Sequence, residues 1–137
     1  MDRTFAIIKP DAVRNNYTGK IYDRILLKGF KILASKDIHM SRMQAEEFYG
    51  IHRGKPFFEE LTTFMSSGRC MVLALEKEDA VNYWREVIGA TNPEDADEGT
   101  IRKEFASSIG ENAVHGSDSN ENAAKEIGFF FSGIELI

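Results

Sequence analysis

The six residues Cys70–Leu75 are all apolar, and this unbroken run constrains the fold more than any other feature of the chain. A strand that is apolar at every position is buried on both faces, so other elements must cover both sides of its sheet. Thr4–Lys9 is a second short run of strand formers, and Pro10 ends it. Residues Phe30–Met40 largely alternate between apolar and polar, which predicts a half-buried strand.

The segments around these three strands carry apolar residues at helical spacing. Ser41 and Gln44 have the spacing of a capping box, and Gly89 supplies a stop after Ile88. The predicted helices span about Ile21–Leu26, Ser41–Ile51, Pro56–Met65, Ala80–Ile88, Thr100–Phe105 and Ser119–Phe130. Residues 90–99 are polar and predict a loop, and residues 107–119 are expected to be irregular. This order, with helices between strands, predicts a compact α/β sandwich.

Length and charge limit what the chain can be. Its 137 residues correspond to one domain, residues 1–137, and its 17 basic and 22 acidic residues give a formal net charge of −5. That balance argues against broad nucleic-acid binding. It still allows a small anionic ligand, because a few Lys and Arg side chains can converge locally.

Cysteine usage and the N-terminal residues predict the location. Cys70 is the only cysteine, so an intrachain disulfide is excluded. The first residues lack the basic and long apolar regions of a signal peptide, and no apolar run reaches the ~18 to 20 residues of a membrane span. We therefore expect a cytoplasmic protein that does not engage a membrane.

The segment Asn112–Ser119, which reads Asn-Ala-Val-His-Gly-Ser-Asp-Ser, is the most informative for chemistry. Gly116 permits a close approach of the backbone beside His115, and a neutral imidazole can act as a nucleophile. A hydrolase triad of His115, Ser117 and Asp118 is disfavoured, because triad members normally converge from separate parts of a fold. Taken alone, His115 is more simply interpreted as a surface histidine.

Other site chemistries find little support in the chain. His39 and His52 have no partner at metal-ligand spacing and one cysteine cannot build a zinc site, so both histidines are interpreted as structural or surface residues. Neither GxxxxGK[ST] nor a GxGxxG after a strand is present, which excludes a P-loop kinase. Taken singly, Lys9, Arg85 and Arg102 are each interpreted as an ordinary solvated charge.

Five segments taken together resemble the nucleoside diphosphate kinase family. They keep that family's order and spacing, and the resemblance covers residues 3 to about 131. The segments are Lys9–Asp11, Lys55–Phe58, Gly89–Pro93, Gly99–Arg102 and Asn112–Ser119. The resemblance implies a ferredoxin-like βαββαβ core with a four-stranded antiparallel sheet. An inserted loop region, residues 90–119, would build the nucleotide site.

The resemblance also implies an enzyme that transfers the γ-phosphate of a nucleoside triphosphate, typically ATP, to a nucleoside diphosphate by a ping-pong mechanism. His115 would carry the phosphoryl group on Nδ1, Glu126 would bond the other ring nitrogen, and Ser117 would bond that carboxylate. Lys9 would lie near the transferring group. The alternative is a catalytically silent nucleotide-binding or regulatory module on the same scaffold, although the nucleophile, its partner and the cations are all present.

Residues that match the family's nucleotide-binding positions come from distant parts of the chain. They are Lys9, Tyr49, Phe57, Leu61, Arg85, Thr91, Arg102, Ile109 and Asn112. Phe57 would stack on the base beside Leu61 and Ile109, and stacking without hydrogen bonds to the base edge predicts broad base specificity. Mg²⁺ would be held mainly by the nucleotide phosphates, and Asp118 or Asp11 would contribute only through water.

Two positions depart from the family pattern. Arg69 stands where proline is common, which would alter the start of the next strand. Trp84 is bulkier than the usual neighbour of Arg85, and we interpret it as core or surface packing rather than a subunit contact. The resemblance implies a homo-oligomer and leaves the dimer, the tetramer and the hexamer open. The expected partners are thus nucleotides and other copies of the chain, and no specific nucleic acid is expected.

Overall fold

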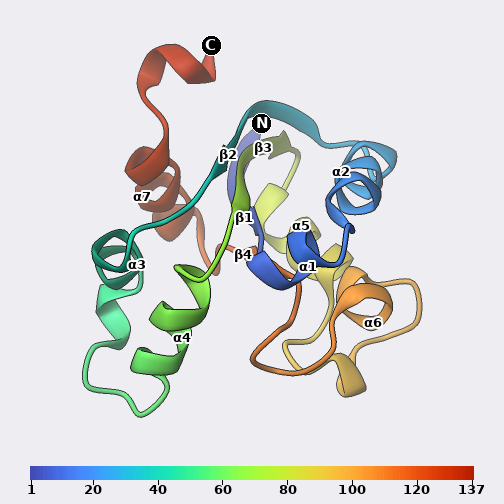
Figure 1. The fold of residues 1–137 in the computed structure, drawn as a ribbon. Helices are drawn as coiled ribbons and strands as arrows, with labels where there is room; N and C mark the ends of the chain where they lie inside the picture. The colour runs from blue at the N-terminus through green and yellow to red at the C-terminus, as the bar shows by residue number, and fades with distance from the viewer.

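The computed structural model describes residues 1–137, and its centre is a four-stranded antiparallel sheet (Figure 1). The strands are β1 (Asp2–Ile8), β2 (Lys31–Ile38), β3 (Cys70–Lys77) and β4 (Val114–Gly116). They lie in the order β2-β3-β1-β4, and each neighbouring pair is antiparallel. The connection from β1 to β2 skips β3, and the connection from β3 to β4 skips β1. The predicted ferredoxin-like core is therefore confirmed.

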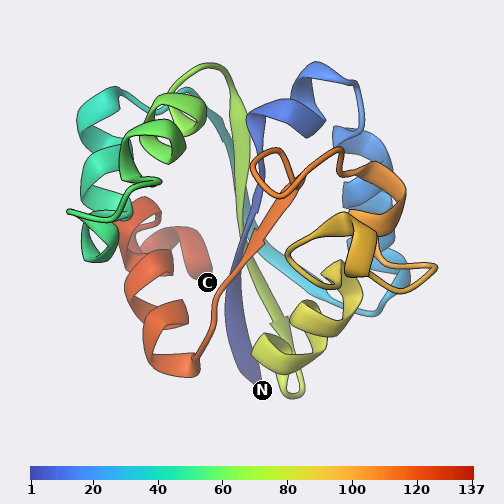
Figure 2. The same ribbon diagram turned by 90° about the horizontal axis from the view of Figure 1, so that it is seen from below.

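Helices cover both faces of the sheet, which Figure 2 shows between two helical layers. One layer holds α1 (Pro10–Arg14), α2 (Thr18–Leu27), α5 (Ala80–Ile88) and α6 (Ile101–Phe105). The other layer holds α3 (Arg42–Phe48), α4 (Phe58–Met65) and α7 (Asn120–Phe130). Short 3-10 helices are η1 (Gly50–His52), η2 (Pro93–Asp95) and η3 (Gly133–Leu136). None of the helices has the length and apolar character needed to cross a membrane.

The two layers enclose two hydrophobic cores, and the alternation of side chains along β1 contributes to both. Phe5 and Ile7 belong to the core on the side of α3, α4 and α7, whereas Ala6 and Ile8 belong to the core on the side of α2 and α5. All four side chains are fully buried. Residues 72–75 of β3 are also fully buried, which confirms the strand predicted to be covered on both faces.

A helix forms in each predicted segment, and the Ser41–Gln44 capping box is present at the start of α3. The helix expected to reach Ile51 ends at Phe48, and Ile51 lies in η1. Pro56 was expected in the first turn of a helix but lies before α4. It occupies a turn in which the Phe58 N–H donates to the Lys55 carbonyl at 3.1 Å. Trp84 is fully buried in the core, in agreement with its interpretation as a packing residue. The exposed Arg69 leaves the next strand intact, because β3 begins directly after it.

One expectation for the backbone was wrong, and one helix, α1, was not expected. Residues 107–119 are not irregular throughout, because β4 lies within them and pairs with Ala6–Ile8 of β1. Pro10 does more than end β1, since it occupies the first turn of α1, where its missing N–H leaves no hydrogen bond unmade. Both elements join β1 to the inserted region and therefore position the residues discussed below.

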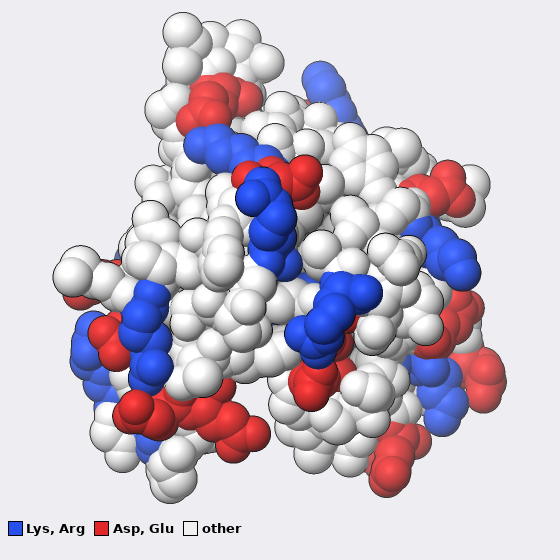
Figure 3. Space-filling model, viewed as in Figure 1, with Lys and Arg blue, Asp and Glu red and all other residues white.

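Acidic and basic side chains are interspersed on the face shown in Figure 3. Ion pairs such as Arg42–Glu59 and Lys36–Glu135, both at 3.0 Å, join segments that are distant in the sequence. These pairs lie in contact with solvent, so each contributes only about 0 to 1 kcal/mol. A basic side chain that is both buried and without an acidic partner is therefore exceptional in this molecule.

Candidate active site

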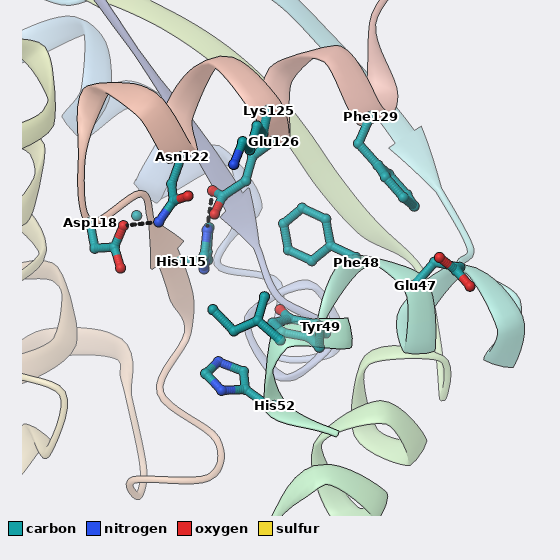
Figure 4. A pocket seen from close by; sticks show the side chains of 12 residues that line it. Glu47, Phe48, Tyr49, His52, His115, Asp118, Asn122, Lys125, Glu126 and Phe129 are labelled. Carbon is teal, nitrogen blue, oxygen red and sulfur yellow. Dashed lines mark hydrogen bonds and ion pairs between the residues drawn. The ribbon is translucent and has the colours of Figure 1, made fainter. Parts of the chain in front are cut away.

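His115, the middle residue of β4, lies at the centre of the site (Figure 4). Its Nε2 is 2.8 Å from Oε1 of Glu126 on α7, and the Ser117 hydroxyl donates to the same oxygen at 2.8 Å. A carboxylate oxygen can only accept, so Nε2 carries the ring hydrogen and Nδ1 keeps its lone pair. The arrangement thus leaves one ring nitrogen free to act as a nucleophile.

Neighbouring side chains fix the position of the His115 ring and backbone. Phe5 and Phe48 meet the ring edge-on, with centroids 6.0 and 5.7 Å away. The Trp84 indole N–H donates to the His115 carbonyl at 3.1 Å. Gly116 permits this contact, because a Cβ there would lie 2.8 Å from the Trp84 ring. The close approach predicted at Gly116 is confirmed, and it holds β4 against α5.

Three adjoining hollows around His115 hold most of the predicted site residues. The first, of about 350 Å³, is lined by residues that include His115, Glu126, Tyr49 and Asp118. The second, of about 190 Å³, shares Gly116 with the first and is lined by Arg85, Thr91 and Arg102 among others. The third, of about 660 Å³, shares Thr91 with the second and includes Lys9, Phe57, Leu61, Ile109 and Asn112. Ser117 lines none of the three and contacts the site through Glu126.

Three cations in these hollows have no acidic partner. Lys9, Arg85 and Arg102 form no ion pair within 4.0 Å, and Lys9 and Arg102 are each only 8% exposed. The Lys9 ammonium donates to Oδ1 of Asn112 at 2.8 Å, and Arg102 donates to three backbone carbonyls. Buried charge without a counter-charge is unfavourable. The arrangement therefore favours a ligand that carries several negative charges.

Burial and mutual repulsion shift the pKa values of two of these cations. Burial, followed by the charge of Arg102, lowers the pKa of Lys9 to about 8. Burial and the charge of Arg85 lower the pKa of Arg102 to about 10. Both groups remain mainly protonated at neutral pH, so the second and third hollows present positive charge that negative phosphates would stabilise.

Two further side chains line the hollow of His115 from the segment after α3. Tyr49 is 7% exposed and its buried hydroxyl has no hydrogen-bond partner, and burial raises its pKa. His52 was interpreted as a structural or surface residue, yet it lies in this hollow with Nδ1 3.2 Å from the Lys55 ammonium. Burial and the charge of Lys55 lower the His52 pKa. Its only signal in the sequence is its place just before the Lys55–Phe58 segment.

The fold and the site define a class of protein, a phosphotransferase that uses nucleotides. His115, with one free ring nitrogen, lies next to the hollow of Arg85 and Arg102. The third hollow adjoins it and carries an apolar slot, which is lined by Phe57, Leu61 and Ile109. The family model described as nucleoside diphosphate kinase matches residues 2–136. The chain belongs to the nucleoside diphosphate kinase family, and it is an enzyme that transfers phosphoryl groups between nucleoside triphosphates and diphosphates.

Relatives match the chain over its whole length. It is 59% identical to the nucleoside diphosphate kinase of Geotalea uraniireducens over 137 residues, which are 100% of both chains. It is also 59% identical to that of Cereibacter sphaeroides, over 100% of this chain and 98% of the relative. The crystal structure of the Aquifex aeolicus enzyme has a TM-score of 0.97 at 46% identity, covering 99% of each chain. The halophilic enzyme from Halobacterium salinarum in complex with CDP has a TM-score of 0.95 at 37% identity, covering 99% of this chain and 91% of that one.

Proposed function

We propose that Nδ1 of His115 carries the phosphoryl group in a ping-pong reaction. In the first half-reaction, the Nδ1 lone pair bonds to the γ-phosphorus of a nucleoside triphosphate, and the bond from that phosphorus to the bridging oxygen breaks. The nucleoside diphosphate leaves with that electron pair. In the second, a terminal oxygen of another diphosphate takes the phosphoryl group and Nδ1 regains its lone pair. The observation that carries the proposal is the 2.8 Å contact between Nε2 and Glu126, because it leaves Nδ1 open.

The polar groups around His115 would bind the phosphates. At 4 Å and an effective dielectric constant near 20, each of Lys9, Arg85 and Arg102 stabilises a phosphate charge by about 4 kcal/mol. Phosphoryl transfer needs little covalent help beyond the nucleophile, so positioning and neutralising these charges supplies most of the rate enhancement. Hydrogen bonds to the phosphates and the ribose would come from Thr91 and Asn112. Tyr49 would contribute through its ring, because its hydroxyl is buried.

The apolar slot of the third hollow would take the base. Phe57 is 47% exposed and Ile109 is 59% exposed, so both present apolar surface at the opening of this hollow. Leu61 lines the same hollow. Stacking of a base on an aromatic side chain contributes about 1–3 kcal/mol whatever the base, because every base has a flat face. Broad base specificity follows.

The side chains of the site suit a Mg²⁺ ion that is held mainly by phosphate oxygens. No group of three His, Cys, Asp or Glu side chains could hold a metal ion alone, and Mg²⁺ commonly binds substrate phosphates and keeps several waters. Asp118 lines the hollow of His115, and its hydrogen bond from Asn122 at 2.6 Å keeps its pKa low. Its carboxylate would hold a water of the ion, which would neutralise part of the phosphate charge. Asp11 is 2% exposed and lines none of the three hollows, so it has no place in this ion site.

The proposal extends to the domain organisation, the assembly and the location of the protein. Residues 1–137 act as one domain, since a single sheet joins both halves of the chain. Copies of the chain assemble into a homo-oligomer of two, four or six subunits. The unpaired edge of strand β2 and the exposed side chains of Leu26 and Leu27 support this proposal. Light scattering on the purified chain measures the number of subunits. A cytoplasmic location agrees with Cys70, a buried free thiol whose pKa burial raises to about 12.

Transfer of label from ATP tests the proposed function. The wild type should gain acid-labile label on His115 from γ-labelled ATP and lose it to an added nucleoside diphosphate, whereas His115→Ala should gain none and lose turnover. His39→Ala is the matched control, because His39 is exposed and its ring contacts the Ser66 carbonyl at 2.9 Å, and it should behave as the wild type. Turnover retained by His115→Ala would overturn the proposal. Nucleotide binding without exchange in the wild type would support the silent module instead.

A further inference from the structure

Ala113, two residues before His115, has a backbone conformation that is rare for a residue with a side chain. Its φ is 72°, and the Val114 N–H donates to the Asn112 carbonyl at 2.8 Å, which closes a γ-turn around Ala113. The γ-turn with positive φ is the strained form, and strained backbone persists only where its surroundings hold it. Ala113 is fully buried, so those surroundings are other parts of the chain.

Residues 9–11 hold the turn at both of its polar groups. Oδ2 of Asp11 accepts the Ala113 N–H at 3.1 Å, and the Lys9 N–H donates to the Ala113 carbonyl at 2.8 Å. Asp11 is 2% exposed, and its Oδ1 is buried without a hydrogen-bond partner. Burying a carboxylate that is only partly hydrogen-bonded is unfavourable, so the burial of Asp11 calls for an explanation.

The turn at Ala113 determines where the phosphate-binding groups lie. The Asn112 side chain meets the Lys9 ammonium at 2.8 Å. The carbonyls of Asn112 and Val114 accept from Arg102 at 3.4 and 2.9 Å, and β4 then leads directly to His115. A different backbone conformation at Ala113 would move the partner of Lys9, the acceptors of Arg102 and the nucleophile together.

We propose that Asp11 is a positioning residue for phosphoryl transfer, which holds the strained turn at Ala113 and thereby places His115 relative to Lys9 and Arg102. Asp11 lines none of the hollows of the site, so it acts without touching the nucleotide. The inference rests on the proposed role of His115. It differs from an ion-binding role, which would need an exposed carboxylate oxygen.

Single-turnover transfer of label from ATP to His115 tests this role. Asp11→Ala should lower the rate roughly 10- to 100-fold, since a misplacement of about 1 Å has effects of that size. Asp11→Asn keeps an oxygen that accepts the Ala113 N–H, and it should stay within about threefold of the wild type. Ala113→Gly removes the steric penalty of a positive φ. Added to Asp11→Ala, it should recover the rate by about fivefold or more, because the penalty for a left-handed backbone at a residue with a side chain corresponds to a factor of roughly 5 to 30.

A matched control separates this rescue from general stabilisation. Asn16→Gly relieves another positive φ, of 65°, outside the three hollows, and it should not recover the rate of Asp11→Ala. Thermal unfolding accompanies each measurement, because a merely structural role would lower the melting temperature and leave the rate per folded molecule unchanged. If Asp11→Ala does not fold, Asp11→Asn decides, and a loss of about tenfold or more in that variant contradicts the inference, since it keeps the acceptor.

The remaining outcomes distinguish the two proposals. If the wild type gains no label, the proposed function of His115 is wrong. If the wild type and Asp11→Ala are labelled at the same normal rate, only the proposed role of Asp11 is wrong. A slow Asp11→Ala that Ala113→Gly does not improve would also overturn that role, because the effect would then not pass through the turn.

Discussion

Glu126 determines which nitrogen of the neutral His115 ring carries the hydrogen. Its Oε1 accepts hydrogen bonds from Nε2 of His115 and from the Ser117 hydroxyl. The Ser117 oxygen in turn accepts a hydrogen bond from the Phe5 N–H of β1 at 3.3 Å. The hydrogen-bonded chain therefore runs from the backbone of the central sheet to the His115 ring. Any group at residue 126 that can donate a hydrogen bond would allow the opposite tautomer.

We expect Glu126→Gln to lower the rate of phosphoenzyme formation roughly 10- to 100-fold. The glutamine amide can donate to Nε2, which places the ring hydrogen on Nδ1 and removes the attacking lone pair. Rapid-quench measurement with labelled ATP gives this rate directly. Glu121→Gln lies on the same helix with an 81% exposed side chain, and it should react at the wild-type rate. If the two variants react equally fast, Glu126 does not set the tautomer.

The family resemblance assigned most residues of the site to one place, although they are distant in the sequence. Lys9 and Asn112, which the resemblance assigns to one site, are joined by a hydrogen bond across 103 positions. The place of His52 was missed, because His52 and His115 come from distant segments and line one hollow only in the folded chain. The contact between Asp11 and Ala113 was missed for the same reason, since it depends on tertiary packing and has no local pattern.

At the scale of elements, β4 is the least self-sufficient part of the sheet. It has only three residues, against about five or six for a typical strand, and it pairs with β1 alone. Two contacts from the helical layer hold its backbone as well. Trp84 of α5 donates to the His115 carbonyl, and Arg102 of α6 donates to the Val114 carbonyl. The position of His115, the proposed nucleophile, therefore depends on the packing of α5 and α6 as well as on the sheet.

Gly116→Ala should lower the free energy of unfolding by about 1–3 kcal/mol and slow the reaction. The added Cβ would lie 2.8 Å from Trp84 and 3.1 Å from Ile88, so α5 and β4 would have to separate. Urea unfolding measures the change. Gly128→Ala on α7 is the control, because no atom lies within 4 Å of its added Cβ, and it should be neutral or stabilising by up to about 1 kcal/mol. Equal stability of both variants would mean that α5 does not fix β4.

Elements whose own residues carry a pattern could be predicted, and those that depend on a neighbour could not. The apolar run of β3 and the amphipathic spacing of α5 are properties of their own side chains, and both elements form where expected. Residues 114–116 read Val-His-Gly and show no alternation, so β4 becomes a strand only because β1 offers it an edge. Helix α1 has only five residues, too few for a periodic pattern to be recognised.

At the scale of the whole molecule, a chain with negative net charge places three unpaired basic side chains in adjoining hollows. The formal net charge is −5, yet Lys9 between β1 and α1, Arg85 of α5 and Arg102 of α6 line adjoining hollows without acidic partners. The overall charge opposes the approach of a nucleotide, so attraction must come from these local charges. Lys9 has the lower of the two shifted pKa values, so we expect nucleotide binding to be coupled to its protonation.

Nucleotide binding should take up a proton at alkaline pH. In the free protein, burial and the charge of Arg102 lower the Lys9 pKa from 10.5 to about 8, against the opposing effect of Asp11. Phosphates beside the ammonium would raise that pKa again. Binding near pH 8.5 should therefore take up roughly half a proton or more, and affinity should fall as the pH rises above about 8. Calorimetric titration in two buffers of different ionisation enthalpy measures the uptake.

The same pKa shift acts on stability in the opposite direction. Between pH 8 and 10.5 the unfolded chain, with Lys9 at its ordinary pKa, binds more protons than the folded protein. The contribution of Lys9 to stability therefore rises with pH across this window. Lys9→Met should lose both this rise and the proton uptake, measured at nucleotide concentrations high enough to saturate its weakened site. If Lys9→Met takes up as many protons on binding as the wild type, another group carries the linkage, because phosphates that contact Lys9 would act on its proton first.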